Sequence, residues 1–150
     1  MWGLRRLAAA LAAAAVAFAA AAASGAEVSV EMLNKSGDRT YAYAPDLLRI
    51  QAGDSVTFLA TDKGHNAVSI DGMLPDGASA IQVGINKQAT VTFDRPGIYG
   101  IKCTPHVGLG MVAVIVVGDG GDLEAARGAA AKLPPKAKER VNALLGQIAG

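Results

Sequence analysis

The sequence predicts an all-β body, a sandwich or barrel of short strands, followed by a helical tail. Three observations predict this class. Several short segments alternate apolar and polar residues, which is the period of a strand buried on one face. Clusters of glycine, proline, asparagine and aspartate separate these segments at short intervals, as turns do in all-β domains. After Gly118 the composition changes to alanine-rich segments with helical spacing.

Residues 1–26 have the composition of a secretory signal peptide that is removed on export. Arg5 and Arg6 provide the positive start, an apolar run follows over 7–23, and the small residues after it suit cleavage. A membrane anchor is the alternative, because the apolar run approaches spanning length, although its many alanines are only weakly apolar. The paired arginines also permit twin-arginine export of a folded protein, as an alternative to the general secretory route. We expect an exported protein with one domain that begins at residue 27.

Five segments are the candidate strands of the body, which we place at 27–118. The first three alternate in the strict sense, and the segment "GIYGIKC" is rich in β-formers. The segment "MVAVIVVG" is apolar almost throughout, as expected for a strand buried on both faces. In chain order the five segments are 27–33, 54–60, 88–94, 97–103 and 111–118.

Two helices are expected in the tail, residues 119–150. Asp122 can cap a helix over 123–132, and the two prolines at 134 and 135 would end it and begin a second helix over 136–150. Apolar residues in the second helix recur at spacings of three and four, which gives it one apolar face. We expect this face to pack on the sandwich, so that the tail is a structural extension of the same domain.

The charge and cysteine content limit the classes of function. The formal net charge is +1 and no basic cluster is present, so the sequence offers no footprint for nucleic acid. Exported proteins normally pair their cysteines, but Cys103 is the only cysteine of the chain and cannot form an internal disulfide. A buried inert thiol and an intermolecular bridge are the simplest interpretations. The neighbours of Cys103 indicate a third.

Cys103, His106 and Met111 lie close together in a segment rich in glycine, which suits a tight loop between two strands. His65 follows another predicted strand, and strand ends meet at one pole of a sandwich. Two imidazoles, one thiolate and one thioether are the ligand set of a blue copper electron-transfer site. Zinc competes for such donors, but structural zinc sites usually have more than one cysteine. The sequence therefore predicts a copper site made by these four residues.

The segments "DKGHN" and "KCTPHVGLGM" resemble the cupredoxins, the type 1 blue copper family. The resemblance extends through "VEMLNK", "AGDSVTF", "MLPDGA", "PGIYGIKC" and the helical tail to the pseudoazurins of that family. Its specific signature is Cys, two residues, His, four residues, Met. Plastocyanins share this spacing but normally end shortly after the last strand.

This resemblance implies an eight-stranded Greek-key cupredoxin sandwich that holds one copper ion, Cu(I) or Cu(II). It also implies an electron carrier of the bacterial periplasm, not an enzyme. The partners would be redox proteins: a denitrification reductase such as copper nitrite reductase, nitrous oxide reductase, or c-type cytochromes. We expect a monomer that does not bind membranes after the signal is removed.

The resemblance also assigns roles to individual residues. Met111 would be the axial ligand and the other three donors equatorial. Asn66 would tie the two ligand loops together and direct its backbone N–H at the sulfur of Cys103. Pro105 has no N–H to donate to that sulfur, so the thiolate keeps fewer hydrogen bonds and remains more electron-rich.

We expect the ring edge of His106 to reach solvent inside an apolar collar that includes Val107 and Leu109, where partners would dock. The family often has an aromatic residue at the first of these collar positions and methionine at the second. These differences suggest a docking surface suited to a different partner. The sequence leaves open whether Tyr41 stacks on a ligand imidazole, as its region approaches one in relatives.

Lysines are expected around this docking surface. Since neighbouring residues of a strand point to opposite faces, Lys102 should face outward if Cys103 faces the metal. Lys63 flanks the other ligand loop, and the resemblance adds Lys35 and Lys87 to a ring that would steer an acidic partner. Ordinary solvated lysines are the alternative.

Two other functions use the same residues. An enzyme could use Cys103 as its nucleophile and His106 as the base, but it would leave His65 and Met111 without a role. A copper chaperone or storage protein would use the same ligands without carrying electrons. A blue colour that ascorbate bleaches reversibly would separate the carrier from both.

Overall fold

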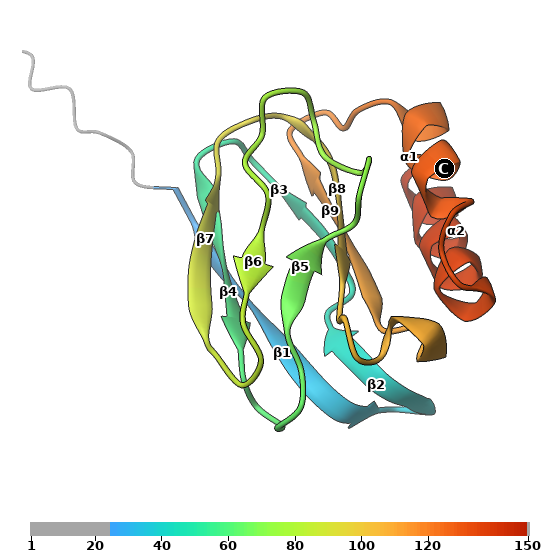
Figure 1. Ribbon diagram of the computed structural model, residues 1–150. Helices are drawn as coiled ribbons and strands as arrows, with labels where there is room; N and C mark the ends of the chain where they lie inside the picture. The colour runs from blue at the N-terminus through green and yellow to red at the C-terminus, as the bar shows by residue number, and fades with distance from the viewer. Residues whose placement is uncertain (1–24, 150) are drawn as a thin grey trace, which may run out of the picture.

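The computed structural model describes residues 25–149, so almost all of the predicted signal peptide lies outside the described residues (Figure 1). Within them, nine strands are followed by two α-helices. The elements are β1 (Glu27–Ser36), β2 (Arg39–Ala44), β3 (Leu47–Ile50), β4 (Asp54–Leu59), β5 (Ala67–Ser69), β6 (Gln82–Val83), β7 (Ala89–Phe93), β8 (Gly97–Lys102), the 3₁₀ helix η1 (Val107–Leu109), β9 (Val112–Val117), α1 (Leu123–Ala130) and α2 (Pro135–Ala149).

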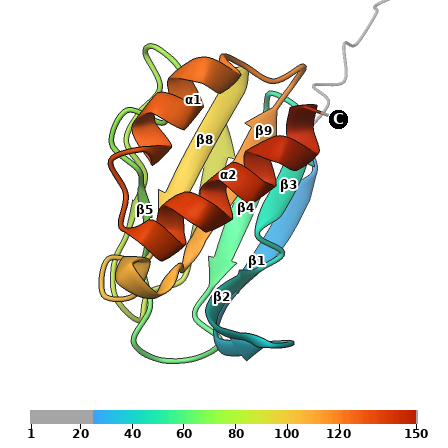
Figure 2. The same cartoon turned by 90° about the vertical axis from the view of Figure 1, so that its right-hand side faces the viewer.

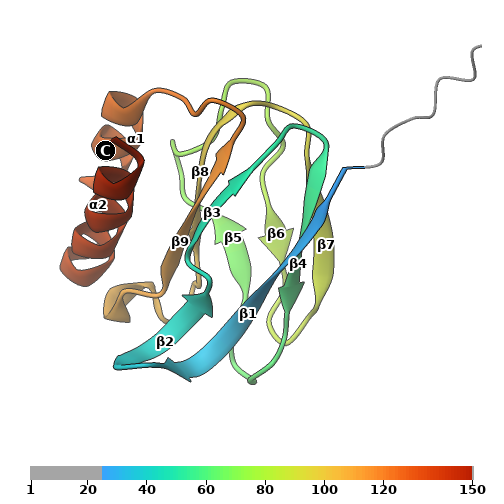
Figure 3. The same cartoon turned by 180° about the vertical axis from the view of Figure 1, so that it is seen from behind.

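The strands form two sheets that face each other, as Figures 1 and 3 show. One sheet has the order β2-β1-β4-β7 and the other the order β3-β9-β8-β5-β6. The pairs β1/β4 and β3/β9 are parallel, and the remaining pairs are antiparallel. Between the sheets lies a core that includes Val30, Phe58, Phe93 and Ile115. The predicted cupredoxin sandwich with a two-helix tail is confirmed.

The strand count is nine instead of the expected eight, and the segment from Arg39 to Ile50 supplies one strand to each sheet. β2 pairs with β1 in the first sheet, whereas β3 pairs with β9 in the second. Pro45 stands at the crossing, where its missing N–H removes no ladder hydrogen bond. This crossing interrupts the alternating pattern, and for that reason the pattern did not reveal these two strands.

β9 is buried along its whole length, as its apolar sequence predicts. Ala113, Ile115 and Val117 face the core between the sheets. The alternate residues, among them Val114, pack under the tail, with Val141 in the same cluster. Figure 2 shows α1 and α2 lying across the outer face of the sheet that contains β8 and β9.

The tail is built as its sequence predicts. The Asp122 carboxylate caps α1 by accepting the N–H of Ala125 at 3.0 Å, and Pro135 is the first residue of α2. Asp46, at the crossing between the sheets, accepts hydrogen bonds from Arg39 and from Arg140 of α2. These bonds attach α2 to the body. Among residues 25–149, neither helix has the length and apolar content needed to cross a membrane.

Candidate metal centre

The ligand candidates come from two loops at one end of the sandwich, the lower end in Figure 1. His65 lies between β4 and β5, while Cys103 directly follows β8 and His106 precedes η1. The β1–β2 hairpin and the β6–β7 loop reach the same end. Loops far apart in the sequence therefore meet at one pole.

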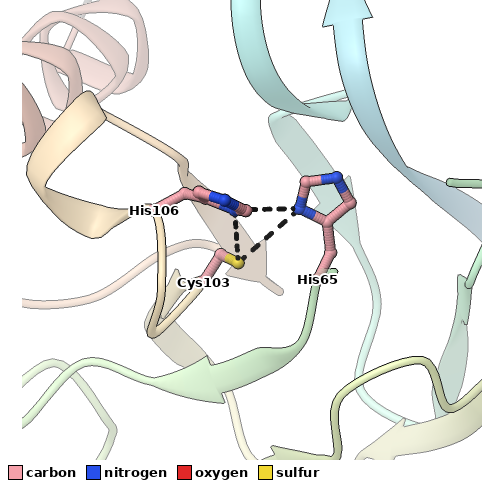
Figure 4. A group of neighbouring side chains, drawn as sticks. All are labelled: His65, Cys103 and His106. Carbon is pink, nitrogen blue, oxygen red and sulfur yellow. Dashed lines mark hydrogen bonds between the residues drawn. The ribbon is translucent and has the colours of Figure 1, made fainter. Parts of the chain in front are cut away.

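Three donor atoms form a triangle at this pole, and their side chains point toward one another (Figure 4). Nδ1 of His65 lies 3.1 Å from Nδ1 of His106, and the sulfur of Cys103 lies 3.8 Å from the first nitrogen and 3.6 Å from the second. The centre of such a triangle is about 2 Å from each atom, close to the length of metal–nitrogen and metal–sulfur bonds. The three donors therefore fit one small transition-metal ion.

The hydrogen bonds of His65 select the protonation state that a metal requires. Its Nε2 lies 2.9 Å from Oδ1 of Asn34, an acceptor, so the ring proton is on Nε2 and the Nδ1 lone pair faces the triangle. Burial lowers the pKa of His65, and the nearby His106 lowers it further, against the opposite effect of Asp62. The His65 ring is thus neutral at neutral pH.

The Cys103 side chain is fully buried, and this burial raises the pKa of its thiol. Hydrogen bonds from the backbone N–H groups of Asn66 and His106 act in the opposite direction, because they favour the thiolate. A raised pKa and a buried sulfur are the reverse of what a reactive nucleophile needs. The same environment suits a thiolate whose charge is balanced by a metal ion.

Asn66 joins the two ligand loops. Its Oδ1 accepts the backbone N–H of Thr104 at 2.7 Å, and its Nδ2 donates to the Thr104 hydroxyl at 3.1 Å. Because Asn66 follows one ligand and Thr104 follows another, these bonds fix the spacing of His65 and Cys103. They are the contacts that the resemblance implies for Asn66.

Met111 is fully buried and belongs to the same core cluster as Cys103. Its carbonyl accepts the N–H of Cys103 at 3.1 Å, and its own N–H donates to the carbonyl of His106 at 3.2 Å. Gly110, which ends η1, has a φ of 91° that favours glycine, and it lets the chain turn back into β9. The backbone therefore brings Met111 beside two of the three triangle residues.

His106 is the half-buried member of the triangle, and Tyr41 covers one face of its ring. The two rings stack with centroids 3.9 Å apart and planes 11° from parallel. Tyr41 has a φ of 55°, a left-handed conformation that is strained for a bulky residue. The stacking that the sequence left open is present.

The expected docking residues lie on the surface of the pole. Leu109 is 51% exposed, Val107 is half-buried and Pro105 is exposed. Lys102 is partly exposed, while Ile101 and Cys103 on either side of it belong to the core cluster, as expected if Lys102 faces outward. Lysines 35, 63 and 87 are exposed.

The structure adds residues that the sequence did not single out. Asn34 holds the His65 ring, and Asn86 accepts the N–H of Gly64 at 2.7 Å while its own N–H donates to the carbonyl of His65 at 3.0 Å. Ile85, next to Asn86, is 45% exposed and joins Leu109 as the second exposed large apolar residue among those described. No local pattern marks these residues, because each contact joins distant segments.

Comparison with known proteins agrees with this geometry. A family model described as copper binding proteins of the plastocyanin/azurin family matches residues 30–118. Pseudoazurin of Methylorubrum extorquens AM1 is 50% identical over 102 residues, 67% of this chain and 69% of the relative. Pseudoazurin of Paracoccus pantotrophus is 44% identical over 120 residues, 79% of this chain and 81% of the relative.

Solved structures are similar over the same region. The crystal structure of pseudoazurin from Methylobacterium extorquens AM1 has a TM-score of 0.77 and 45% identity, and the match covers 81% of this chain and 98% of that one. Native pseudoazurin from Hyphomicrobium denitrificans has a TM-score of 0.76 and 34% identity, again over 81% of this chain and 98% of that one.

Proposed function

Because the chain belongs to the plastocyanin/azurin family of copper-binding proteins, we propose that it carries single electrons to a reductase of the bacterial periplasm. Its class, a pseudoazurin-like blue copper electron-transfer protein with copper as cofactor, follows from the family and from the donor triangle. The location and the partner are the proposed part. The composition of residues 1–26, which is typical of a secretory signal peptide, and the names of the relatives support them.

We assign the copper to His65, Cys103, His106 and Met111. The observation that carries the proposal is the triangle of two Nδ1 atoms and one sulfur. One of its members, the His106 imidazole, is only half-buried. When bound, copper supplies a one-electron Cu(I)/Cu(II) couple. The two ligand loops are held by their own hydrogen bonds, so the donors keep their places when the charge of the ion changes.

The pole offers a route for the electron. His106 is the one ring of the triangle that is not fully buried, and exposed Leu109 lies three residues beyond it. We propose that Val107, Leu109 and Ile85 form the apolar part of the docking surface. The lysines at 35, 63, 87 and 102 form its charged part and would steer an acidic partner.

We propose that the protein is not an enzyme. The sulfur of Cys103 is closed to substrates by burial, and its raised pKa disfavours the thiolate that a nucleophile needs. A copper chaperone or storage protein remains the second candidate, because it would use the same ligands.

Absorption spectroscopy tests the carrier function. The purified protein should take up one copper, become intensely blue and bleach reversibly with ascorbate. A colourless copper-loaded protein would favour the chaperone. A protein that takes up no copper would contradict both.

Stopped-flow kinetics with copper nitrite reductase test the docking proposal. Lys63→Gln with Lys102→Gln should lower the association rate several-fold at low salt and weaken its salt dependence. Arg127→Gln is the matched control, since Arg127 lies on α1 away from the metal pole and is also partly exposed. Equal rates for the control and the lysine variants would contradict steering by these lysines.

A further inference from the structure

Tyr43 is a buried tyrosine of β2 whose hydroxyl group reaches the ligand loops. The side chain is 1% exposed and packs edge-on near Phe58, in the same core cluster as Cys103. Its hydroxyl donates to the backbone carbonyl of Asn66 at 2.6 Å. β2 and β5, the strand that Asn66 directly precedes, belong to different sheets, so this bond crosses the sandwich.

The bond completes the hydrogen bonding of Asn66. Backbone hydrogen bonding from Asn66 lowers the pKa of the Cys103 thiol, and both side-chain groups of Asn66 bind Thr104. The carbonyl is the remaining polar group, and Tyr43 holds it. Three groups of Asn66 therefore engage the cysteine loop, and the fourth is fixed by the opposite sheet.

We propose that Tyr43 is a positioning residue for the copper couple: its hydroxyl fixes the Asn66 backbone so that the Asn66 N–H points at the Cys103 sulfur. This proposal rests on the copper-carrier function above, but not on the identity of the partner. An N–H bond to a thiolate withdraws electron density from the sulfur and so favours the reduced metal. A buried carbonyl without its donor turns toward another partner, and the N–H···S geometry then loosens.

The test is Tyr43→Phe, which keeps the ring and removes the hydroxyl. Tyr99→Phe is the matched control: Tyr99 is also buried, and its hydroxyl also donates to a carbonyl, that of Arg95 at 2.8 Å. Tyr99 lies on β8, four residues before Cys103, and its carbonyl partner precedes that strand. Both variants should unfold at lower urea concentration than the wild type.

Two readouts separate positioning from core packing. Tyr43→Phe should lower the reduction potential and shift the visible band, whereas Tyr99→Phe should leave both at wild-type values. By NMR, hydrogen exchange of the Asn66 amide should become about tenfold faster in Tyr43→Phe, as loss of one hydrogen bond allows. Tyr99→Phe should not change this rate.

If Tyr43→Phe is destabilised like the control and yet keeps the wild-type potential, spectrum and Asn66 exchange rate, Tyr43 is a core residue only and the proposal is wrong. Failure of the wild-type protein to bind copper would instead overturn the proposed function. The Asn66 exchange rate of the copper-free protein would still test the hydrogen bond by itself.

Discussion

The ring of Tyr41 lies flat on the imidazole of His106, with centroids 3.9 Å apart, although its backbone has a left-handed φ of 55°. Asn34, on the neighbouring strand, holds the other imidazole through its Oδ1. Each ring of the triangle is therefore supported from the β1–β2 hairpin, which itself supplies no member of the triangle. The strained backbone conformation of Tyr41 thus accompanies the placement of its ring against the imidazole of His106, a candidate metal ligand.

Replacing Tyr41 separates the value of the stack from the cost of the backbone conformation. Tyr41→Ala should lower the free energy of unfolding of the copper-free protein by about 1–2 kcal/mol, because the aromatic contact is lost while the left-handed strain remains. Tyr41→Gly loses the same contact but relieves the strain, so it should be more stable than the alanine variant by about 1 kcal/mol. Urea unfolding measures both. An alanine variant as stable as the glycine variant would show that the conformation carries no strain.

Pro105→Ala should raise the reduction potential. Pro105 is exposed and has no N–H, and alanine would supply one near the sulfur of Cys103. An added hydrogen bond makes the thiolate less electron-rich and favours the reduced metal. Redox titration of the two proteins measures the difference, and an equal or lower value in the variant would contradict the argument.

Copper affinity of the metal-free protein should rise with pH. Burial raises the pKa of the Cys103 thiol, so the thiol is protonated at neutral pH and loses its proton when the metal binds. His65, whose pKa is lowered, is already neutral there. Affinity should therefore increase about tenfold per unit between about pH 7 and 8, and level off above the thiol pKa. Chelator competition at several pH values measures this slope, and a flat profile would exclude the thiol as a ligand.

Asp46→Asn should destabilise the protein by about 1–3 kcal/mol. The Asp46 side chain is 13% exposed and bonds two arginines, which would lose their counter-charge together. Glu124→Gln is the control, because Glu124 is 86% exposed and pairs with Arg127 on the same helix. That change should cost less than about 1 kcal/mol. If urea unfolding gives equal losses for both variants, the Asp46 cluster does not anchor α2.

The triangle could be predicted from the sequence because soft donors are so few in this chain. With one cysteine and two histidines, the spacing of Cys103, His106 and Met111 left little choice of site. β9 was predictable because its apolar run has a single explanation, burial on both faces. The starts of the two helices followed from Asp122 and from the paired prolines at 134 and 135, whereas α1 ends at Ala130, two residues earlier than expected.

The supporting contacts were not predictable, since they depend on how distant segments meet. The bond from Tyr43 joins positions 23 residues apart, and the bond between His65 and Asn34 joins positions 31 apart. Strands as short as β5 and β6, with three and two residues, have too few positions to show alternation. A sequence pattern records burial along one element, whereas these contacts depend on packing between elements.

Asn34 and Tyr41 stand opposite each other in the β1–β2 hairpin, between the paired residues Leu33–Ala42 and Lys35–Thr40. A shift of that pairing by a single position would turn one of the two side chains away from the pole. The register of this hairpin therefore fixes both imidazoles of the candidate copper site, although the hairpin supplies none of the three donor atoms. Gly37 lies in the turn between β1 and β2. Insertions or deletions at this turn should preserve the site only when they keep the pairing register of the two strands.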